Sequence, residues 1–163
     1  MSIETYTVDI GCGEGKRNGT IGIDFRKAIG VSIVADARWL PIQNEALDRI
    51  YSSHLVEHFS HREIERVLSE WIRCLKKGGL FEIRCPDLRA RCFLFFLNPS
   101  YENVRKIYGA QDYFGNTHLC GFSYGLLKNL LERNGIAKIS RVINGYKGIP
   151  FIPDSLHIKG TKL

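Results

Sequence analysis

The stretch that decides the fold is "TVDIGCGEGKRNGTIGIDF", residues 7–25. A short apolar run meets three alternating glycines, Gly11, Gly13 and Gly15, and a second short run ends at Asp24. Glycine lets the backbone turn sharply and lets a ligand approach without a clash at Cβ. The pattern therefore predicts two strands joined by a turn that can cradle a nucleotide.

The bulk composition predicts one globular domain. The chain has 163 residues, 44% of them hydrophobic and 25% charged, so we expect a single domain over 1–163. Its most apolar window, "CFLFFL", is far shorter than the ~20 residues of a membrane span, and the N-terminus has no secretory pattern. We therefore expect no membrane contact. The five cysteines are widely spaced and include no C-x-x-C pair, which indicates a reduced, cytoplasmic protein without a disulfide framework or a zinc ribbon.

The formal net charge of +6 leaves an acidic partner such as nucleic acid open. Lysines and arginines are spread from Lys16 to Lys162, however, and no run of five or more occurs. A dispersed charge of this kind favours an ordinary solvated surface.

Strand and helix patterns alternate along the chain. Short apolar or alternating runs predict strands at 5–10, 20–24, 31–35, 47–52, 79–84, 136–143 and 155–162. This order is typical of an α/β protein with a mainly parallel sheet and helices on both faces. No helix separates the last two strands, so we expect the final one to enter antiparallel at the sheet edge. Ligands of such sheets bind beyond the carboxyl ends of the strands.

Two segments carry a helical stripe of apolar residues. The first is predicted over 61–77, with a capping box at its start and basic residues and a glycine at its end: Ser60, Glu63, Lys76, Lys77 and Gly78. The second is predicted over 123–134 and stops at Gly135.

The glycine turn differs from the common nucleotide loops. Its spacing is G-x-G-x-G rather than G-x-G-x-x-G, and no G-K-[ST] follows, which excludes a Walker-type phosphate loop. Asp9, at the end of the first strand, would repel a pyrophosphate and suits a cationic amine. S-adenosylmethionine carries such an amine, together with a ribose that Asp24 can bind and an adenine whose amino group Asp36 can bind.

Six segments stand in the order of one known superfamily: "DIGCGEG", "GID", "ADARWLP", "LDRIYSSHLVEHF", "LKKGGLFEIRCPD" and "LLERNGI". In these the chain resembles the class I S-adenosylmethionine-dependent methyltransferases, and among them the small type-11, UbiE-like group. The resemblance covers nearly the whole chain. It implies a Rossmann-like three-layer sandwich around a seven-stranded sheet of order 3-2-1-4-5-7-6, with strand 7 antiparallel.

The resemblance also implies where the cofactor S-adenosylmethionine binds. The turn would face its methionine part, Asp24 its ribose and Asp36 its adenine, and residues 52–54 would line the floor beneath the sulfonium. The cofactor-binding residues so implied are Asp9, Gly11, Cys12, Gly13, Asp24, Phe25, Asp36, Ala37, Ser52 and Ser53. Residues 14–20 are too few for the family's long first helix, and its N-terminal helix is missing, so we expect a partner subunit or the segment 88–120 to complete the pocket.

One motif competes with this interpretation. "HLVEH", His54 to His58, matches H-x-x-E-H, in which two histidines bind zinc and Glu57 acts as a base. The motif follows a parallel strand, the same letters are common at this place in type-11 methyltransferases, and no third zinc ligand is evident downstream. We therefore expect no metal site.

The segment 88–120 is long for one connection and is aromatic and partly basic, so we expect it to cap the site on the acceptor side. Between its glycines stand Gln111, Asp112, Tyr113 and His118, which can orient an acceptor. Our hypothesis is that His54 or His118 is the catalytic general base, because histidine exchanges protons near neutral pH.

The resulting prediction is an S-adenosylmethionine-dependent methyltransferase that acts on a small molecule or a biosynthetic intermediate. A methyltransferase of nucleic acid or protein is the alternative, although the [DN]-P-P-[YF] motif of amino-group methylation is absent where "YSSH" stands. A non-catalytic subunit that binds the cofactor is a third class. The identity of the acceptor stays open, as do a homo-oligomer and a partner subunit.

Overall fold

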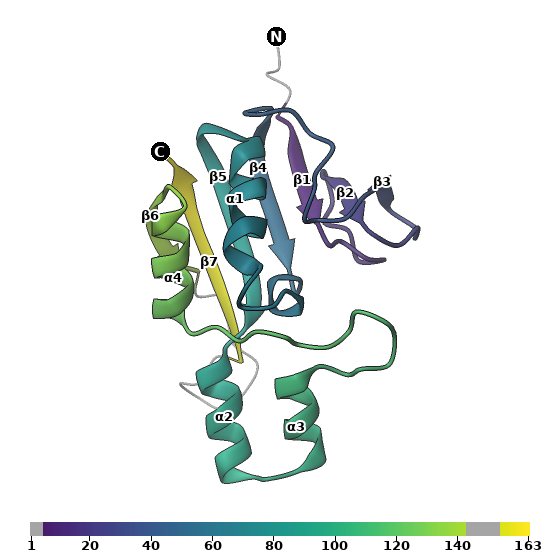
Figure 1. Cartoon of the computed structure of the whole chain (residues 1–163), viewed down its shortest axis with the longest axis vertical. Helices are drawn as coiled ribbons and strands as arrows, with labels where there is room; N and C mark the ends of the chain where they lie inside the picture. The colour runs from purple at the N-terminus through teal and green to yellow at the C-terminus, as the bar shows by residue number, and fades with distance from the viewer. Residues whose placement is uncertain (1–4, 143–153) are drawn as a thin grey trace.

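The computed structural model describes residues 5–142 and 154–163. At its centre is a seven-stranded sheet of order β3-β2-β1-β4-β5-β7-β6, which confirms the expected order (Figure 1). The strands are β1 (Thr7–Ile10), β2 (Ile21–Asp24), β3 (Val31–Val34), β4 (Leu47–Ser53), β5 (Leu75–Pro86), β6 (Ile136–Arg141) and β7 (Ser155–Lys162). All seven expected strands are present, although residue 143, predicted as the end of the sixth, lies outside the described residues.

The last strand runs against the others. β7 pairs antiparallel with both β5 and β6, as the family resemblance implies. The expectation that it sits at the edge of the sheet is wrong, because β7 lies between β5 and β6 and leaves β6 at the edge. In this inner position β7 has a hydrogen-bonded neighbour on each side, and Leu156 and Ile158 are fully buried.

The first long helix, α1 (Ile64–Cys74), is shorter than predicted. At its start one of the two hydrogen bonds of a capping box is present, because the Ser60 amide donates to Oε2 of Glu63 at 3.3 Å. The Ser60 hydroxyl donates to the same oxygen at 2.9 Å. Its end was predicted wrongly: Leu75 already has extended backbone and pairs with β4, so the two lysines that follow belong to β5. Pairing with β4 thus overrides the helical stripe in its last turn.

The core lies between one face of the sheet and two helices, α1 and α4 (Tyr124–Arg133), which both cover that face (Figure 1). Its largest fully buried side chains are Trp71, Phe81, Ile10, Ile23, Ile50, Leu68, Leu75, Ile83, Leu127, Leu131, Ile136 and Leu156. The indole of Trp71 also donates to the carbonyl of Ala37 at 2.8 Å. This bond fixes α1 against the loop that follows β3, which is one of the loops that build the site.

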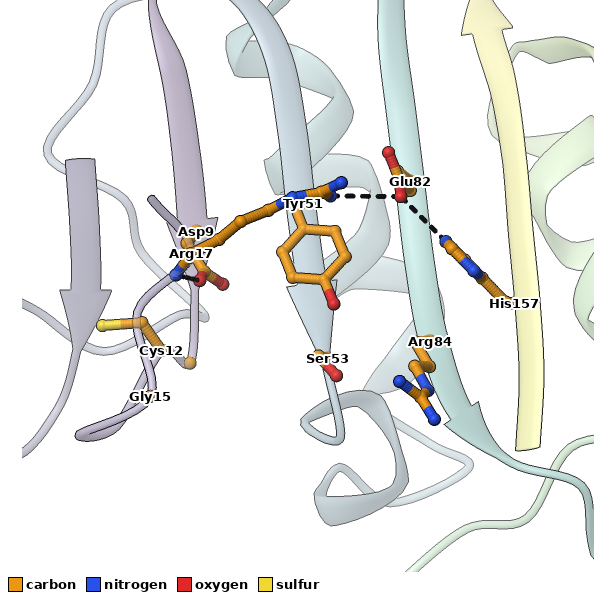
Figure 2. Close-up of a pocket in the computed structure, with 10 residues that line it drawn as sticks. Asp9, Cys12, Gly15, Arg17, Tyr51, Ser53, Glu82, Arg84 and His157 are labelled. Carbon is orange, nitrogen blue, oxygen red and sulfur yellow. Dashed lines mark hydrogen bonds and ion pairs between the residues drawn. The ribbon is translucent and has the colours of Figure 1, made fainter. Parts of the chain in front are cut away.

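The opposite face of the sheet is polar. Tyr51, Glu82, Arg84 and His157 stand on it, while the helices lie behind the sheet in the same view (Figure 2). Among the described residues no helix covers this face, and the link between β1 and β2 forms turns rather than a helix, as predicted from its length. The charged side chains of the face bond one another instead.

Glu82 is the centre of these bonds. Its carboxylate accepts hydrogen bonds from Arg17 (3.1 Å), from Arg49 and from Nε2 of His157 (2.8 Å). Burial alone would raise the pKa of Glu82, but these three donors outweigh it and hold the pKa at about 2. Three neighbouring strands and the loop after β1 are therefore tied together through one carboxylate.

Beyond the carboxyl end of β5, two helices, α2 (Leu88–Leu97) and α3 (Tyr101–Tyr108), pack against each other away from the sheet (Figure 1). Their N-termini are capped by the side chains of Asp87 and Ser100. Within the described part of the chain, no helix has the length and apolar character that crossing a membrane requires. The expectation of a cytoplasmic protein stays a prediction.

Candidate functional site

The glycine turn after β1 is closed from two sides. Gly11 has a φ of +73°, its amide donates to Ile23 at 2.8 Å, and a Cβ at this position would lie 2.6 Å from Cδ2 of Leu55. Both the backbone conformation and the space therefore require glycine here. The turn brings the end of β1 against the end of β2.

Asp24, the last residue of β2, stabilises this turn with its side chain. Its side chain is buried, Oδ2 accepts from the amide of Gly13 at 2.9 Å, and Oδ1 accepts from the amide of Arg26 at 2.9 Å. Each carboxylate oxygen can accept a second hydrogen bond, so the group can still bind two hydroxyls of a ligand.

A cavity of about 360 Å³ opens in front of Asp24. We call it the Asp24 cavity. It gathers seven of the predicted site residues, namely Gly11, Gly13, Asp24, Phe25, Asp36, Ala37 and His54. The carboxylate of Asp36 is held by Arg38, whose amide donates to Oδ1 at 2.9 Å and whose guanidinium forms an ion pair at 3.3 Å.

The segment 88–120 reaches this cavity with its last part. Tyr113, Phe114 and Gly115 line the Asp24 cavity. The guanidinium of Arg26 lies 4.3 Å from the ring centre of Tyr113 and 5.5 Å from that of Phe25. An arginine between two aromatic rings joins this segment to the end of β2.

A second cavity, of about 420 Å³, lies on the polar face of the sheet and shares Gly11 with the first (Figure 2). We call it the Asp9 cavity. Its polar lining includes Asp9, Arg17, Ser53 and Arg84. Oδ2 of Asp9 accepts from the amide of Arg17 at 2.8 Å, and burial raises the pKa of this carboxyl group despite that bond. A cationic group in the cavity would offset the cost of burying the Asp9 charge.

Two of the predicted cofactor-binding residues, Cys12 and Ser52, do not line the Asp24 cavity. Cys12 lines the Asp9 cavity, but burial raises the pKa of its thiol, and the carboxylates of Asp9 and Asp24 raise it further. The thiol is therefore protonated at neutral pH. Ser52 is fully buried and donates its hydroxyl to the carbonyl of Ile10 at 2.9 Å, so it joins β1 to β4.

The two predicted catalytic histidines both lie near Glu57 but differ in their position relative to the cavities. His54 lines the Asp24 cavity and has a φ of +54°, which is costly for a residue with a Cβ. His118 lines neither the Asp24 cavity nor the Asp9 cavity; its ring packs edge-on against His58, with 5.1 Å between the ring centres. Burial lowers the pKa of His118.

Sequence reasoning missed Arg17, Arg26 and Arg84, which line the two cavities. For Arg84 a signal existed: "FEIR" alternates apolar and charged residues, although an inner strand of a parallel sheet is normally apolar on both faces. This alternation indicates that the Arg84 side of the sheet is polar. Arg17 follows a turn and Arg26 follows the end of a strand. At such places the sequence spacing does not indicate which way a side chain points.

The comparisons with known proteins agree with this geometry. Residues 20–83 match the type-11 model of a methyltransferase domain. The matched segment covers less than half of the chain, and in it the chain is similar to the type-11 methyltransferases. No curated protein sequence matches it significantly.

Solved structures show the same fold. An S-adenosylmethionine-dependent methyltransferase from Thermotoga maritima has a TM-score of 0.68 at 22% identity, covering 100% of this chain and 84% of that one. One from Archaeoglobus fulgidus has a TM-score of 0.67 at 18% identity, covering 97% and 86%. A Haloferax volcanii methyltransferase in complex with the activator Trm112 has a TM-score of 0.64 at 17% identity, covering 99% and 85%.

S-adenosylmethionine fits the residues that line the two cavities. A glycine turn without room for a Cβ lets the cofactor approach the backbone, and carboxylates stand at the ends of β1 and β2 and just after β3. Parallel strands present ligands at these ends. The two cavities, which share Gly11, also offer separate surroundings for the two halves of the cofactor.

Proposed function

We propose that the chain is an S-adenosylmethionine-dependent methyltransferase that holds the cofactor across both cavities. Asp24 would accept hydrogen bonds from the ribose, while Phe25, Asp36 and Ala37 would surround the adenine in the Asp24 cavity. Support comes from the carboxylate of Asp24, which is buried at the cavity wall and keeps free acceptor positions.

The methionine half would occupy the Asp9 cavity. Its ammonium group would offset the buried charge of Asp9, and its carboxylate would be attracted by Arg17 and Arg84. Gly11 belongs to both cavities, so the sulfonium would lie near this residue, between the two halves. Ser53 and His54, from the end of β4 and the residue after it, line one cavity each.

We propose a small molecule or biosynthetic intermediate as the methyl acceptor. The observation that carries this is that the chain itself lines the Asp24 cavity with Tyr113, Phe114 and Gly115 of the segment 88–120. A concave site with aromatic walls favours an acceptor that fits inside over a bulky polymer. The Thermotoga maritima neighbour, described as a possible histamine N-methyltransferase, is similar in fold.

When bound, the cofactor supplies a methyl group on a positively charged sulfur, which leaves as a neutral thioether. The chain's own tasks are to orient the acceptor and to exclude water. His54 would remove the acceptor's proton, because it lines the cavity and its left-handed backbone aims the side chain from the end of β4.

The whole chain, 1–163, would act as one methyltransferase domain, with 88–120 as its acceptor-side cap. A partner is a second element of the proposal. The polar sheet face lacks a helix among the described residues, and the Haloferax volcanii neighbour was solved with an activator subunit. A partner subunit would cover this face and close the Asp9 cavity.

Methyl transfer from isotopically labelled S-adenosylmethionine tests the acceptor class. Purified protein is incubated separately with a cell extract below about 3 kDa, with total RNA and with extracted protein. We expect label only in the small-molecule fraction. Label in RNA or protein would contradict a small-molecule acceptor and identify that polymer as the acceptor class. Cofactor binding without transfer to any fraction would favour a non-catalytic subunit.

A further inference from the structure

A cluster of ionisable side chains adjoins the Asp24 cavity, where the short helix η1 (Val56–His58) meets the segment that follows α3. Glu57, in η1, is 1% exposed, and within the described residues neither of its carboxylate oxygens accepts a hydrogen bond. His54 Nδ1 lies 3.3 Å from Oε1, but out of line for such a bond. A buried carboxylate in this state is costly unless a cation joins it.

Two histidines beside Glu57 present a free ring nitrogen. Nδ1 of His58 lies 3.1 Å from the carbonyl of Thr117, and Nδ1 of His118 lies 2.9 Å from that of Ile107. A carbonyl only accepts, so each Nδ1 donates and each Nε2 carries the lone pair. Metal-binding histidines are held in the same way, with the second ring N–H on a carbonyl or carboxylate.

The three residues are close enough to share an ion. One potential ligand atom each from Glu57, His58 and His118 lies within 4.8 Å of the others. Ligand atoms around Zn²⁺ lie about 3.3 Å from one another, because each bond to the ion is about 2.0–2.2 Å long. Side-chain rotations that move the ligand atoms by about an ångström would therefore bring all three within bonding distance of one ion. A hollow of about 10 Å³, lined by Glu57 and His118, adjoins them and has room for about one water or ion.

The surrounding charges leave Glu57 available to a cation. Arg91 and Lys106 also line the hollow, but each has its own acidic partner. The pair Lys106–Glu102 spans 2.8 Å and the pair Arg91–Asp154 spans 3.4 Å. The charge of Glu57 has no such fixed partner apart from the histidines around it.

We propose that Glu57, His58 and His118 bind one divalent transition-metal ion, with Zn²⁺ as the usual occupant of two imidazoles and one carboxylate. The site differs from the H-x-x-E-H zinc motif, because His54 is not a ligand and Glu57 is one.

The ion would join η1 to the segment that follows α3. The amides of Leu119 and Cys120 already donate to the carbonyl of Glu57 at 2.8 and 3.1 Å, and His118 belongs to the same segment. Metal bonds from η1 to this segment fix the cap next to the Asp24 cavity, whose wall includes His58. Metal binding by these three residues requires neither the acceptor nor catalysis.

The test measures metal binding by the full chain. Protein treated with a chelator is titrated with Zn²⁺ against a chromophoric zinc chelator, and Co²⁺ is added in a parallel experiment. We expect one equivalent of Zn²⁺ and the visible absorption of a four- or five-coordinate Co²⁺ ion. Glu57→Gln and His118→Ala should each weaken Zn²⁺ binding more than about tenfold, the loss already known for outer-shell partners of metal ligands.

His61→Ala is the matched control, because His61 is an exposed histidine close in sequence but outside the cluster. It should bind Zn²⁺ like the wild type. Less than one equivalent in wild-type protein overturns the proposal without reference to any variant. Equal weakening by His61→Ala, or an unchanged affinity in His118→Ala, overturns it as well.

Discussion

The carboxylate of Asp24 accepts a hydrogen bond of 2.9 Å from the amide of Gly13. One side chain thereby fixes the glycine turn and presents acceptors to the cavity beside it. The turn and the ribose site are consequently one structure, since a change at Asp24 alters both.

Replacing Asp24 by Asn should separate these two tasks. Asn keeps one oxygen for the turn but loses the charge and one acceptor, so the affinity for S-adenosylhomocysteine should fall about tenfold or more while the protein stays folded. Calorimetric titration measures the affinity. Asp48→Asn is the control, because Asp48 bonds Lys76 at 2.7 Å and lines neither the Asp24 cavity nor the Asp9 cavity; the affinity of this variant should equal that of the wild type.

Gly11→Ala should destabilise the protein. The left-handed backbone and the clash with Leu55 together should lower the free energy of unfolding by at least about 2 kcal/mol. Gly125→Ala is the opposite case, since Gly125 lies in α4 with no atom near its missing Cβ, and it should stabilise by a few tenths to about 1 kcal/mol. Denaturant unfolding compares the two variants; equal stability of both would contradict the role of Gly11.

Glu82 should make the protein sensitive to acid. Its folded-state pKa of about 2 lies below the ordinary value of 4.5, so its contribution to stability is present above pH 4.5 and disappears as the pH falls toward 2. The contribution at neutral pH is on the order of 3 kcal/mol at most. Glu82→Gln should therefore be less stable than the wild type at pH 7.

The same variant supplies its own check. The difference in unfolding free energy between Glu82→Gln and the wild type should shrink as the pH is lowered from 4.5 toward 2. A difference that stays constant over this range would show that the ion pairs with Arg17, Arg49 and His157 do not lower the pKa as described.

His54→Ala should affect turnover rather than cofactor affinity. Loss of a general base typically costs about 10²–10⁴ in rate, whereas the cofactor contacts of the Asp24 cavity remain. The measurement pairs single-turnover methyl transfer with titration of S-adenosylhomocysteine. Loss of affinity equal to the loss of rate would place His54 in cofactor binding instead of proton transfer.

Much of the fold follows from local sequence patterns. The seven strands are short runs bounded by glycines, prolines or polar residues, so their positions were predictable within a few residues. The end of α1 was not, because pairing of Leu75 with β4 is a tertiary contact that no helical stripe reveals. The inner position of β7 likewise depends on strand pairing far along the chain.

The site divides in the same way. Asp24 and Asp36 end or follow strands, where topology alone brings them together, and both line one cavity. Ser52 differs from Ser53 because successive residues of a strand point to opposite faces, and the face of Ser52 is the buried one. The cluster of Glu57 with His118 joins residues from η1 and a distant loop, which no spacing could predict.

The most direct measurement is a calorimetric comparison of S-adenosylhomocysteine with 5′-methylthioadenosine, which lacks the amino-acid part. If the cofactor spans both cavities, S-adenosylhomocysteine binds one to one and at least about tenfold more tightly, and Arg84→Met removes most of that advantage. Equal affinities would contradict the use of the Asp9 cavity. No binding of either compound by the wild type would contradict a cofactor site built by this chain alone.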